Sequence, residues 1–141
     1  MKKAHFTILV ALICVLITVI TIPALAVDIE ALINLYISDP TTATYQLLDL
    51  IETDPDAVAL VLAGVAERIA GLEPTDPDRA TLVGRIQGFC IALIDTNPTL
   101  TARIAATIKE EVPEIGEGIE QALVGAGLEE SYLRAASPVR P

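Results

Sequence analysis

The sequence predicts an all-α protein of five or six short amphipathic helices, and two observations carry that prediction. First, an Asp or Asn followed directly by Pro recurs along the chain, at positions 39–40, 54–55, 76–77 and 97–98. Asp and Asn side chains accept hydrogen bonds from the free amides of a helix start, and Pro suits the first helical position because the N–H there has no partner. Second, the apolar residues in between recur every three or four positions, which is the period of a helix and not of a strand.

The connections between these helices are predicted to be two to five residues long. Short connections place consecutive helices side by side in antiparallel fashion. The helices should therefore form a compact bundle or, as the alternative, a short array of helical hairpins.

Residues 1–26 are predicted to form a signal peptide with a helical core that is cleaved on export. Two lysines precede an almost wholly apolar stretch at residues 6–22, and Pro23 and the small residues at 24–26 then supply a cleavage site. The alternative is an uncleaved anchor, because the apolar stretch is long for a signal and marginal for a membrane span. Cleavage is favoured, so we expect an exported protein, periplasmic or secreted, that keeps no stable membrane anchor.

Residues 27–136 are predicted to form a single helical domain, and its first helix covers residues 28–37. A short helix after Pro40 has Tyr45, Leu48 and Ile51 on one face. The next two helices follow Pro55 and Pro77 and have the densest apolar patterns. These patterns are Val58, Val61, Leu62, Val65, Ile69 and Leu72 in the first, and Leu82, Val83, Ile86, Phe89, Cys90, Leu93 and Ile94 in the second.

Two further helices are predicted after Pro98 and Pro113. Their apolar positions are Leu100, Ile104, Ile108 and Val112 in the first, and Ile115, Ile119, Leu123 and Ala126 in the second. Glycines are expected at helix ends, at Gly71 and again at Gly125 and Gly127. Residues 137–141 contain two prolines and are expected to form a flexible tail.

The charge balance excludes some classes of partner. Nine Lys and Arg face nineteen Asp and Glu, a net charge of −10, and removal of residues 1–26 would leave seven bases and a charge of −12. Nucleic acid is therefore not an expected partner, because phosphates require a basic surface. The same sign opposes attachment to anionic lipid surfaces.

The residue types of the mature chain disfavour catalysis. His5 is the only histidine and lies in the leader, so the mature chain has no histidine for a catalytic triad or a His-ligated metal. Cys14 would also be removed, which leaves Cys90 alone and excludes dithiol chemistry and Cys-rich metal sites. We expect no enzyme activity, no cofactor and no metal.

Two Asp-Pro-Asp segments, at 54–56 and 76–78, are the remaining candidates for chemistry. They could form a calcium site or an acid–base pair. The simpler interpretation is an N-cap followed by an acid in the first turn, where it meets the positive end of the helix dipole. We favour that interpretation because the residues around them do not follow the ligand pattern of a calcium loop.

Three residues of the helix after Pro77 have a structural and a functional interpretation. Cys90 lies among apolar positions, so a small buried residue is favoured over a reactive thiol. Gly84 and Gly88 are four residues apart, which favours close packing against the preceding helix, with a homo-oligomeric contact as the alternative.

Two functions follow as hypotheses. The first is protein–protein interaction by an adaptor, inhibitor or assembly subunit, in which an acidic face meets an unidentified partner, and a basic surface on that partner would be complementary. That face consists of Glu110, Glu111, Glu114, Glu117 and Glu120. A solvated surface that keeps the protein soluble is the simpler explanation of these acids. The alternative function is a carrier of an apolar small molecule or lipid between helices. Its cavity would be lined by Ile86, Phe89, Cys90 and Leu93.

Overall fold

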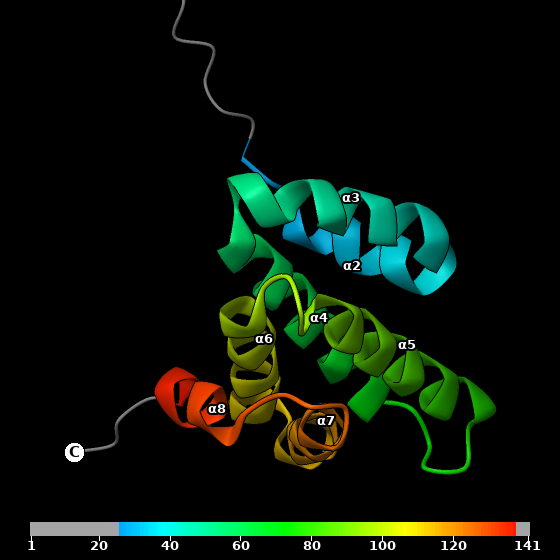
Figure 1. The fold of residues 1–141 in the computed structure, drawn as a ribbon. Coiled ribbons are helices and arrows are strands. Elements are labelled where there is room, and N and C mark those ends of the chain that lie inside the picture. The colour runs from blue at the N-terminus through cyan, green and yellow to red at the C-terminus, as the bar shows by residue number, and fades with distance from the viewer. Residues whose placement is uncertain (1–25, 138–141) are drawn as a thin grey trace, which may run out of the picture.

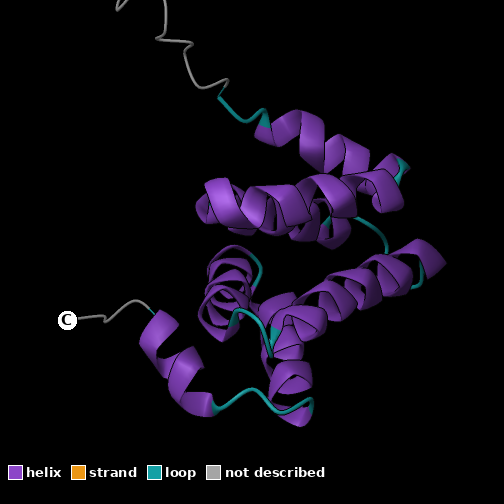
Figure 2. Ribbon diagram, turned by 45° about the horizontal axis from the view of Figure 1, so that its top comes forward, coloured by secondary structure: helices purple, strands orange, loops and turns teal. Residues whose placement is uncertain are grey.

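The computed structural model describes residues 26–137, in which the chain forms seven helices and no strand (Figure 2). In chain order they are α2 (Ile29–Ser38), α3 (Pro40–Thr53), α4 (Pro55–Ala70), α5 (Pro77–Leu93), α6 (Pro98–Glu111), α7 (Pro113–Gly125) and α8 (Glu130–Ala136). The all-α class and the compact arrangement are confirmed, but the expected count of five or six was too low. The predicted signal peptide and most of the tail lie outside the described residues, so export stays a prediction.

The helix that the sequence analysis missed is α8. It has seven residues, none of them fully buried, so its apolar pattern is too short to reveal a helical period. It is held by contact with α6.

The predicted helix starts are confirmed at all four Asp-Pro and Asn-Pro sites, each with a side-chain oxygen that accepts from a backbone amide of the first turn. The accepting residue and the donating amide are Asp39 and Thr42 at 3.2 Å, Asp54 and Ala57 at 3.1 Å, Asp76 and Asp78 at 2.9 Å, and Asn97 and Leu100 at 3.1 Å. Asp28 caps α2 in the same way, by accepting from Ala31 at 3.0 Å. The caps satisfy amides that would otherwise have no partner within the helix.

Three connections are single residues, shorter than the two to five expected. Asp39, Asp54 and Val112 each end one helix and begin the next, with φ between −149° and −135°. The reason is the proline that follows each of them, because its ring forces the preceding residue out of the helical region. Val112 has no side-chain oxygen, so α7 begins without a side-chain cap.

Helices α4 and α6 lie at the centre of the fold (Figure 1). Helix α4 contacts α2, α3, α5 and α6, while α6 contacts α4, α5, α7 and α8. Nine of the sixteen residues of α4 are buried, including Val58, Leu62 and Ile69, as expected of a helix covered on most sides. The hairpin of α2 and α3 covers one side of α4, and α7 and α8 lie at the opposite end of the molecule (Figure 1).

Two glycines, Gly64 on α4 and Gly116 on α7, allow close helix contacts. A Cβ at Gly64 would overlap the side chain of Ile33 on α2, and a Cβ at Gly116 would overlap the backbone of Lys109 on α6. At Gly84 and Gly88 a Cβ would meet nothing within 4 Å. The prediction that these two pack against the preceding helix is therefore wrong, because α5 turns both of them to the outside.

Within residues 26–137, no helix combines the length and the apolar character needed to cross a bilayer.

Candidate functional site

A groove of about 700 Å³ lies between α3 and α5. Both helices pack on α4, and they diverge enough to leave the space between them open to solvent. The groove is lined from α3 by Pro40, Thr41, Thr44, Tyr45 and Leu48, from α5 by Arg85, Gly88, Phe89, Ala92 and Leu93, and in addition by Tyr36 and Thr96. Most of this lining is apolar, and the polar groups are few.

Tyr36 reaches the groove from α2 and is the most deeply buried of its lining residues, with only 1% of its surface exposed. No group among the described residues hydrogen-bonds its hydroxyl, and no fully buried side-chain oxygen there lacks a partner. Tyr36 is therefore almost fully enclosed at the groove, and its hydroxyl has no hydrogen-bonded partner among the described residues.

The Tyr36 hydroxyl holds its proton at neutral pH. Burial raises the pKa of Tyr36 to about 12, Cys90 adds to the increase, and the positive charge of Arg85 opposes it. A protonated phenol donates a hydrogen bond, so Tyr36 offers a donor at the floor of the groove.

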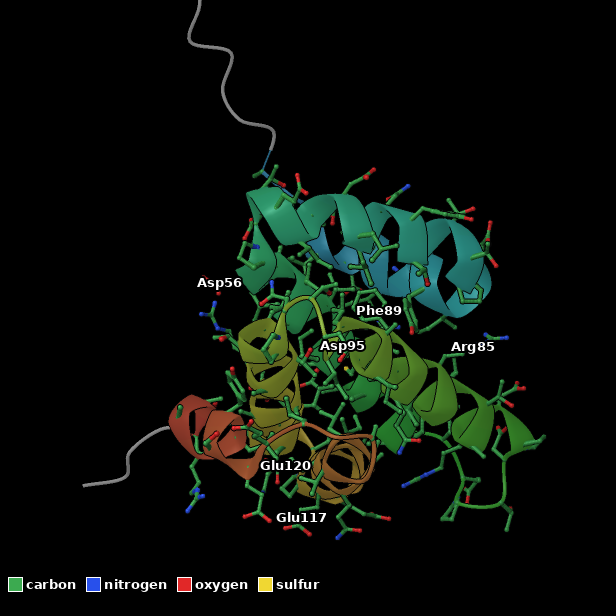
Figure 3. All side chains as sticks on the ribbon, viewed as in Figure 1. Asp56, Arg85, Phe89, Asp95, Glu117 and Glu120 are labelled. Carbon is green, nitrogen blue, oxygen red and sulfur yellow. The ribbon has the colours of Figure 1, made fainter. Side chains whose placement is uncertain are left out.

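Among the described residues, Arg85 is the only charged side chain that lines the groove. The described part of the chain has six Lys and Arg, and four of them form ion pairs: Arg68 with Glu30, Arg79 with Glu114, Arg103 with Asp56 and Lys109 with Glu120. Arg85 and Arg134 form none within residues 26–137. The only acid within α5 is Asp78, in its first turn and seven residues before Arg85. Figure 3 shows Asp95, which follows α5, beyond the opposite end of that helix from Asp78. The groove therefore has a positive end in a protein with a charge of −10.

The four residues predicted to line a cavity divide into two pairs. Phe89 and Leu93 line the groove, and Figure 3 shows Phe89 on the side of α5 toward α3. Ile86 and Cys90 have no exposed surface, belong to the hydrophobic core and do not line the groove. Burial raises the pKa of the Cys90 thiol to about 12, so Cys90 is the small buried residue that its neighbours predicted.

Two of the five glutamates of the predicted acidic face form ion pairs with a base. The Nζ of Lys109 lies 2.6 Å from Glu120, and this hydrogen bond raises the pKa of Lys109. A nitrogen of Arg79 lies 3.7 Å from Glu114. Glu110, Glu111 and Glu117 are exposed and form no ion pair within the described residues. Figure 3 shows Glu117 and Glu120 at the end of the molecule opposite the groove.

The Asp-Pro-Asp segments act as helix starts in the structure. Asp54 and Asp76 cap α4 and α5, and Asp56 pairs with Arg103 on α6. Across residues 26–137, no three side chains of Asp, Glu, Cys or His gather closely enough to hold a metal ion.

A second groove, of about 650 Å³, lies between α2 and α3. Its apolar lining includes Leu32, Leu35 and Leu50, but its charged lining residues are Asp28 and Asp49. Both grooves lie beside α3, but the charged lining residue of the first is Arg85 and those of the second are acids. The second groove therefore serves as a comparison within the same molecule for the binding of a charged ligand.

Sequence reasoning missed Tyr36 and Arg85. Tyr36 occupies an apolar position of α2 next to Leu32 and Ile33, so the pattern marks it as a core residue. Arg85 directly precedes the buried Ile86 and resembles any base at the edge of an amphipathic helix. Tyr36 and Arg85 line the same groove because α2 and α3 lie beside α5. The apolar periodicity of each helix does not predict which helices lie side by side.

Comparison with known proteins adds no further evidence. The chain matches no protein-family model, no curated protein and no solved structure. The function is therefore argued from the grooves and charges of the chain itself.

Proposed function

We propose that the protein is a non-catalytic carrier that binds an apolar small molecule in the groove between α3 and α5. The observation that carries this proposal is the open, mostly apolar groove with Tyr36 at its floor. Its volume of about 700 Å³ falls within the range of small-molecule sites, which are mainly apolar with a few polar groups.

The rim of the groove supports the same proposal. Tyr45 is 67% exposed and Leu48 is 42% exposed, although both are large apolar side chains. On the opposite wall, Gly88 leaves a space that any other residue would occupy. An apolar ligand that covers these side chains removes their surface from water, which is favourable.

Fluorescence of the uncharged dye N-phenyl-1-naphthylamine tests this proposal on the full chain. We expect saturable binding to the wild type and its loss in Gly88→Leu. A Cβ at position 88 meets no neighbour, so the leucine extends into the groove without disturbing the fold.

Gly84→Leu is the matched control. Gly84 lies one turn earlier on α5, is equally open and does not line the groove. Gly84→Leu should bind the dye as the wild type does. A wild type without saturable binding, or equal binding by both variants, would overturn the proposal.

A second candidate is binding of a basic protein partner by the acidic surface of α6 and α7. It is favoured by the exposed Glu110, Glu111 and Glu117, which have no partner base among the described residues. Glu114 and Glu120 contribute less to such binding because Arg79 and Lys109 already compensate them.

Cross-linking in the native host with a C-terminal tag tests this second candidate. A stoichiometric partner should be recovered with the wild type and lost with the triple variant Glu110→Gln, Glu111→Gln, Glu117→Gln. Increasing salt should weaken the same complex, because exposed charges are screened. Recovery that the triple variant leaves unchanged would contradict an acidic docking surface.

A further inference from the structure

The inference that follows rests on the proposed groove function and concerns the chemistry of the ligand. The lining of the groove is mostly apolar, and four of its donors have no hydrogen-bonded partner among the described residues: the hydroxyls of Tyr36, Thr41 and Tyr45 and the Arg85 guanidinium. Arg85 is the charged one of these and Tyr36 is the most deeply buried. Both are donors without an acidic partner among the described residues. Such an arrangement selects a ligand with one polar end that accepts hydrogen bonds and a long apolar remainder.

The charges around the groove indicate that the polar end of the ligand is negative. Within residues 26–137, no Asp or Glu lines this groove, whereas Asp28 and Asp49 line the neighbouring groove on the other side of α3. One guanidinium balances one negative charge, and its planar fork matches the two oxygens of a carboxylate.

We propose that the groove between α3 and α5 binds a single-chain amphiphile with a carboxylate head group, which pairs with Arg85 and accepts a hydrogen bond from Tyr36. The apolar chain then runs along α5 past Gly88 and Phe89 toward Ala92 and Thr96. Residues 85 to 93, the helical part of this wall, span about 12 Å at the rise of an α-helix, which is room for an extended acyl chain of medium length.

The buried position of Tyr36 is the independent support for this proposal. A phenol hydroxyl in the core normally bonds to a protein group. Here Tyr36 is buried, its hydroxyl has no hydrogen-bonded partner among the described residues, and it lines the same groove as Arg85, which forms no ion pair within those residues. A carboxylate between the two residues would satisfy both donors.

The test is displacement of N-phenyl-1-naphthylamine from the full chain by three probes with the same alkyl chain. These probes are dodecanoate, the uncharged dodecan-1-ol and the cationic dodecyltrimethylammonium. Dodecanoate should displace the dye at concentrations about tenfold lower than dodecan-1-ol, because the ionic head group makes charge-assisted hydrogen bonds. The advantage should shrink as the NaCl concentration rises.

Two variants locate the head group. Arg85→Gln should remove the advantage of dodecanoate over dodecan-1-ol while the dye still binds, since the dye is uncharged. Tyr36→Phe, which keeps the buried ring, should reduce the advantage by a severalfold factor. Arg134→Gln is the control, because Arg134 is the other described base without an ion pair and lies on α8, away from the groove.

The outcomes separate this inference from the proposed function. Equal displacement by dodecanoate and dodecan-1-ol, or an advantage that survives Arg85→Gln, would overturn the carboxylate assignment and leave the apolar groove intact. A preference for dodecyltrimethylammonium would also overturn it and would point to the groove of Asp28 and Asp49. The groove function itself fails if the wild type does not bind the dye, or if Gly88→Leu binds the dye as well as the wild type does.

Discussion

Gly116 on α7 faces Lys109 on α6 so closely that a Cβ at position 116 would overlap the Lys109 backbone. This approach is backbone against backbone, so no flexible side chain can move to make room. It brings α6 and α7 together directly after the single-residue turn at Val112, and the side chain of Lys109 then reaches Glu120. The packing of the C-terminal half of the fold depends on this contact.

Gly116→Ala should destabilise the protein by about 1–3 kcal/mol, because the added methyl group forces the two helices apart. Urea unfolding followed by circular dichroism measures the change. Gly118→Ala is the control on the same helix, since a Cβ there meets nothing within 4 Å. The control should stabilise by up to about 1 kcal/mol through helix propensity. Equal stabilisation by both substitutions would contradict the close contact.

Gly84→Ala and Gly88→Ala should each stabilise the monomer by about 0.5–1 kcal/mol. Both glycines lie within α5 and face open space, so alanine reduces the entropy of the unfolded chain without a steric cost. Thermal unfolding at several protein concentrations checks this. A loss of stability relative to the wild type that is largest at high protein concentration and disappears on dilution would instead show that a second copy packs on these glycines.

Asp54→Ala should cost about 1 kcal/mol, because the Asp54 carboxylate accepts from the Ala57 amide at the start of α4. Asp56→Ala should cost less, because Asp56 is exposed and alanine has the higher helix propensity. The substitution removes an ion pair with Arg103 and a charge near the positive end of the α4 dipole, and exposed interactions of either kind contribute about 0.3–1 kcal/mol. Added salt should reduce the stability cost of Asp56→Ala and leave the cost of Asp54→Ala nearly unchanged. A larger cost for Asp56→Ala would contradict the assignment of Asp54 as the cap.

Stability should fall between pH 9 and about 12, partly through Cys90. Burial raises the pKa of this thiol from its ordinary value of 9.0 to about 12, so above pH 9 the unfolded chain ionises while the folded chain does not. Ionisation therefore favours unfolding in this window, and Cys90 has no such effect below pH 9.

Cys90→Ala provides the measurement. It should be less stable at pH 7 because of the cavity that it leaves, but its free energy of unfolding should fall less steeply with pH above 9. Some slope should remain, since burial also raises the pKa of Tyr36 to about 12. An identical slope in the variant and the wild type would contradict the buried, protonated thiol.

The positions of the helices could be predicted because their signals are local. An Asp or Asn before a proline fixes a helix start within one turn, and the apolar period fixes which face is buried, as at Leu62 and Ile69. The length of the connections was harder to predict. Asp39, Asp54 and Val112 each serve two helices at once, which a count of residues between apolar runs does not reveal.

The candidate site could be predicted only in part because it depends on which helices meet. The periodicity of α5 singles out Phe89 and Leu93, but equally Ile86 and Cys90, since all four share the inner face. The structure places the first pair at the edge toward α3 and the second pair in the core. The glycines show the same limit. Gly84 and Gly88 face open space, whereas Gly116 lies at a tight helix contact, and the sequence pattern does not distinguish the two cases.

Titration of the isotope-labelled protein with dodecanoate, followed by amide chemical shifts in NMR spectra, tests the central claim most directly. The account predicts saturable shifts at Tyr36, Arg85 and Gly88, with little change at Leu35 and Leu50 in the groove between α2 and α3. Shifts confined to that second groove, or no saturable shifts, would contradict a carrier that binds its ligand between α3 and α5.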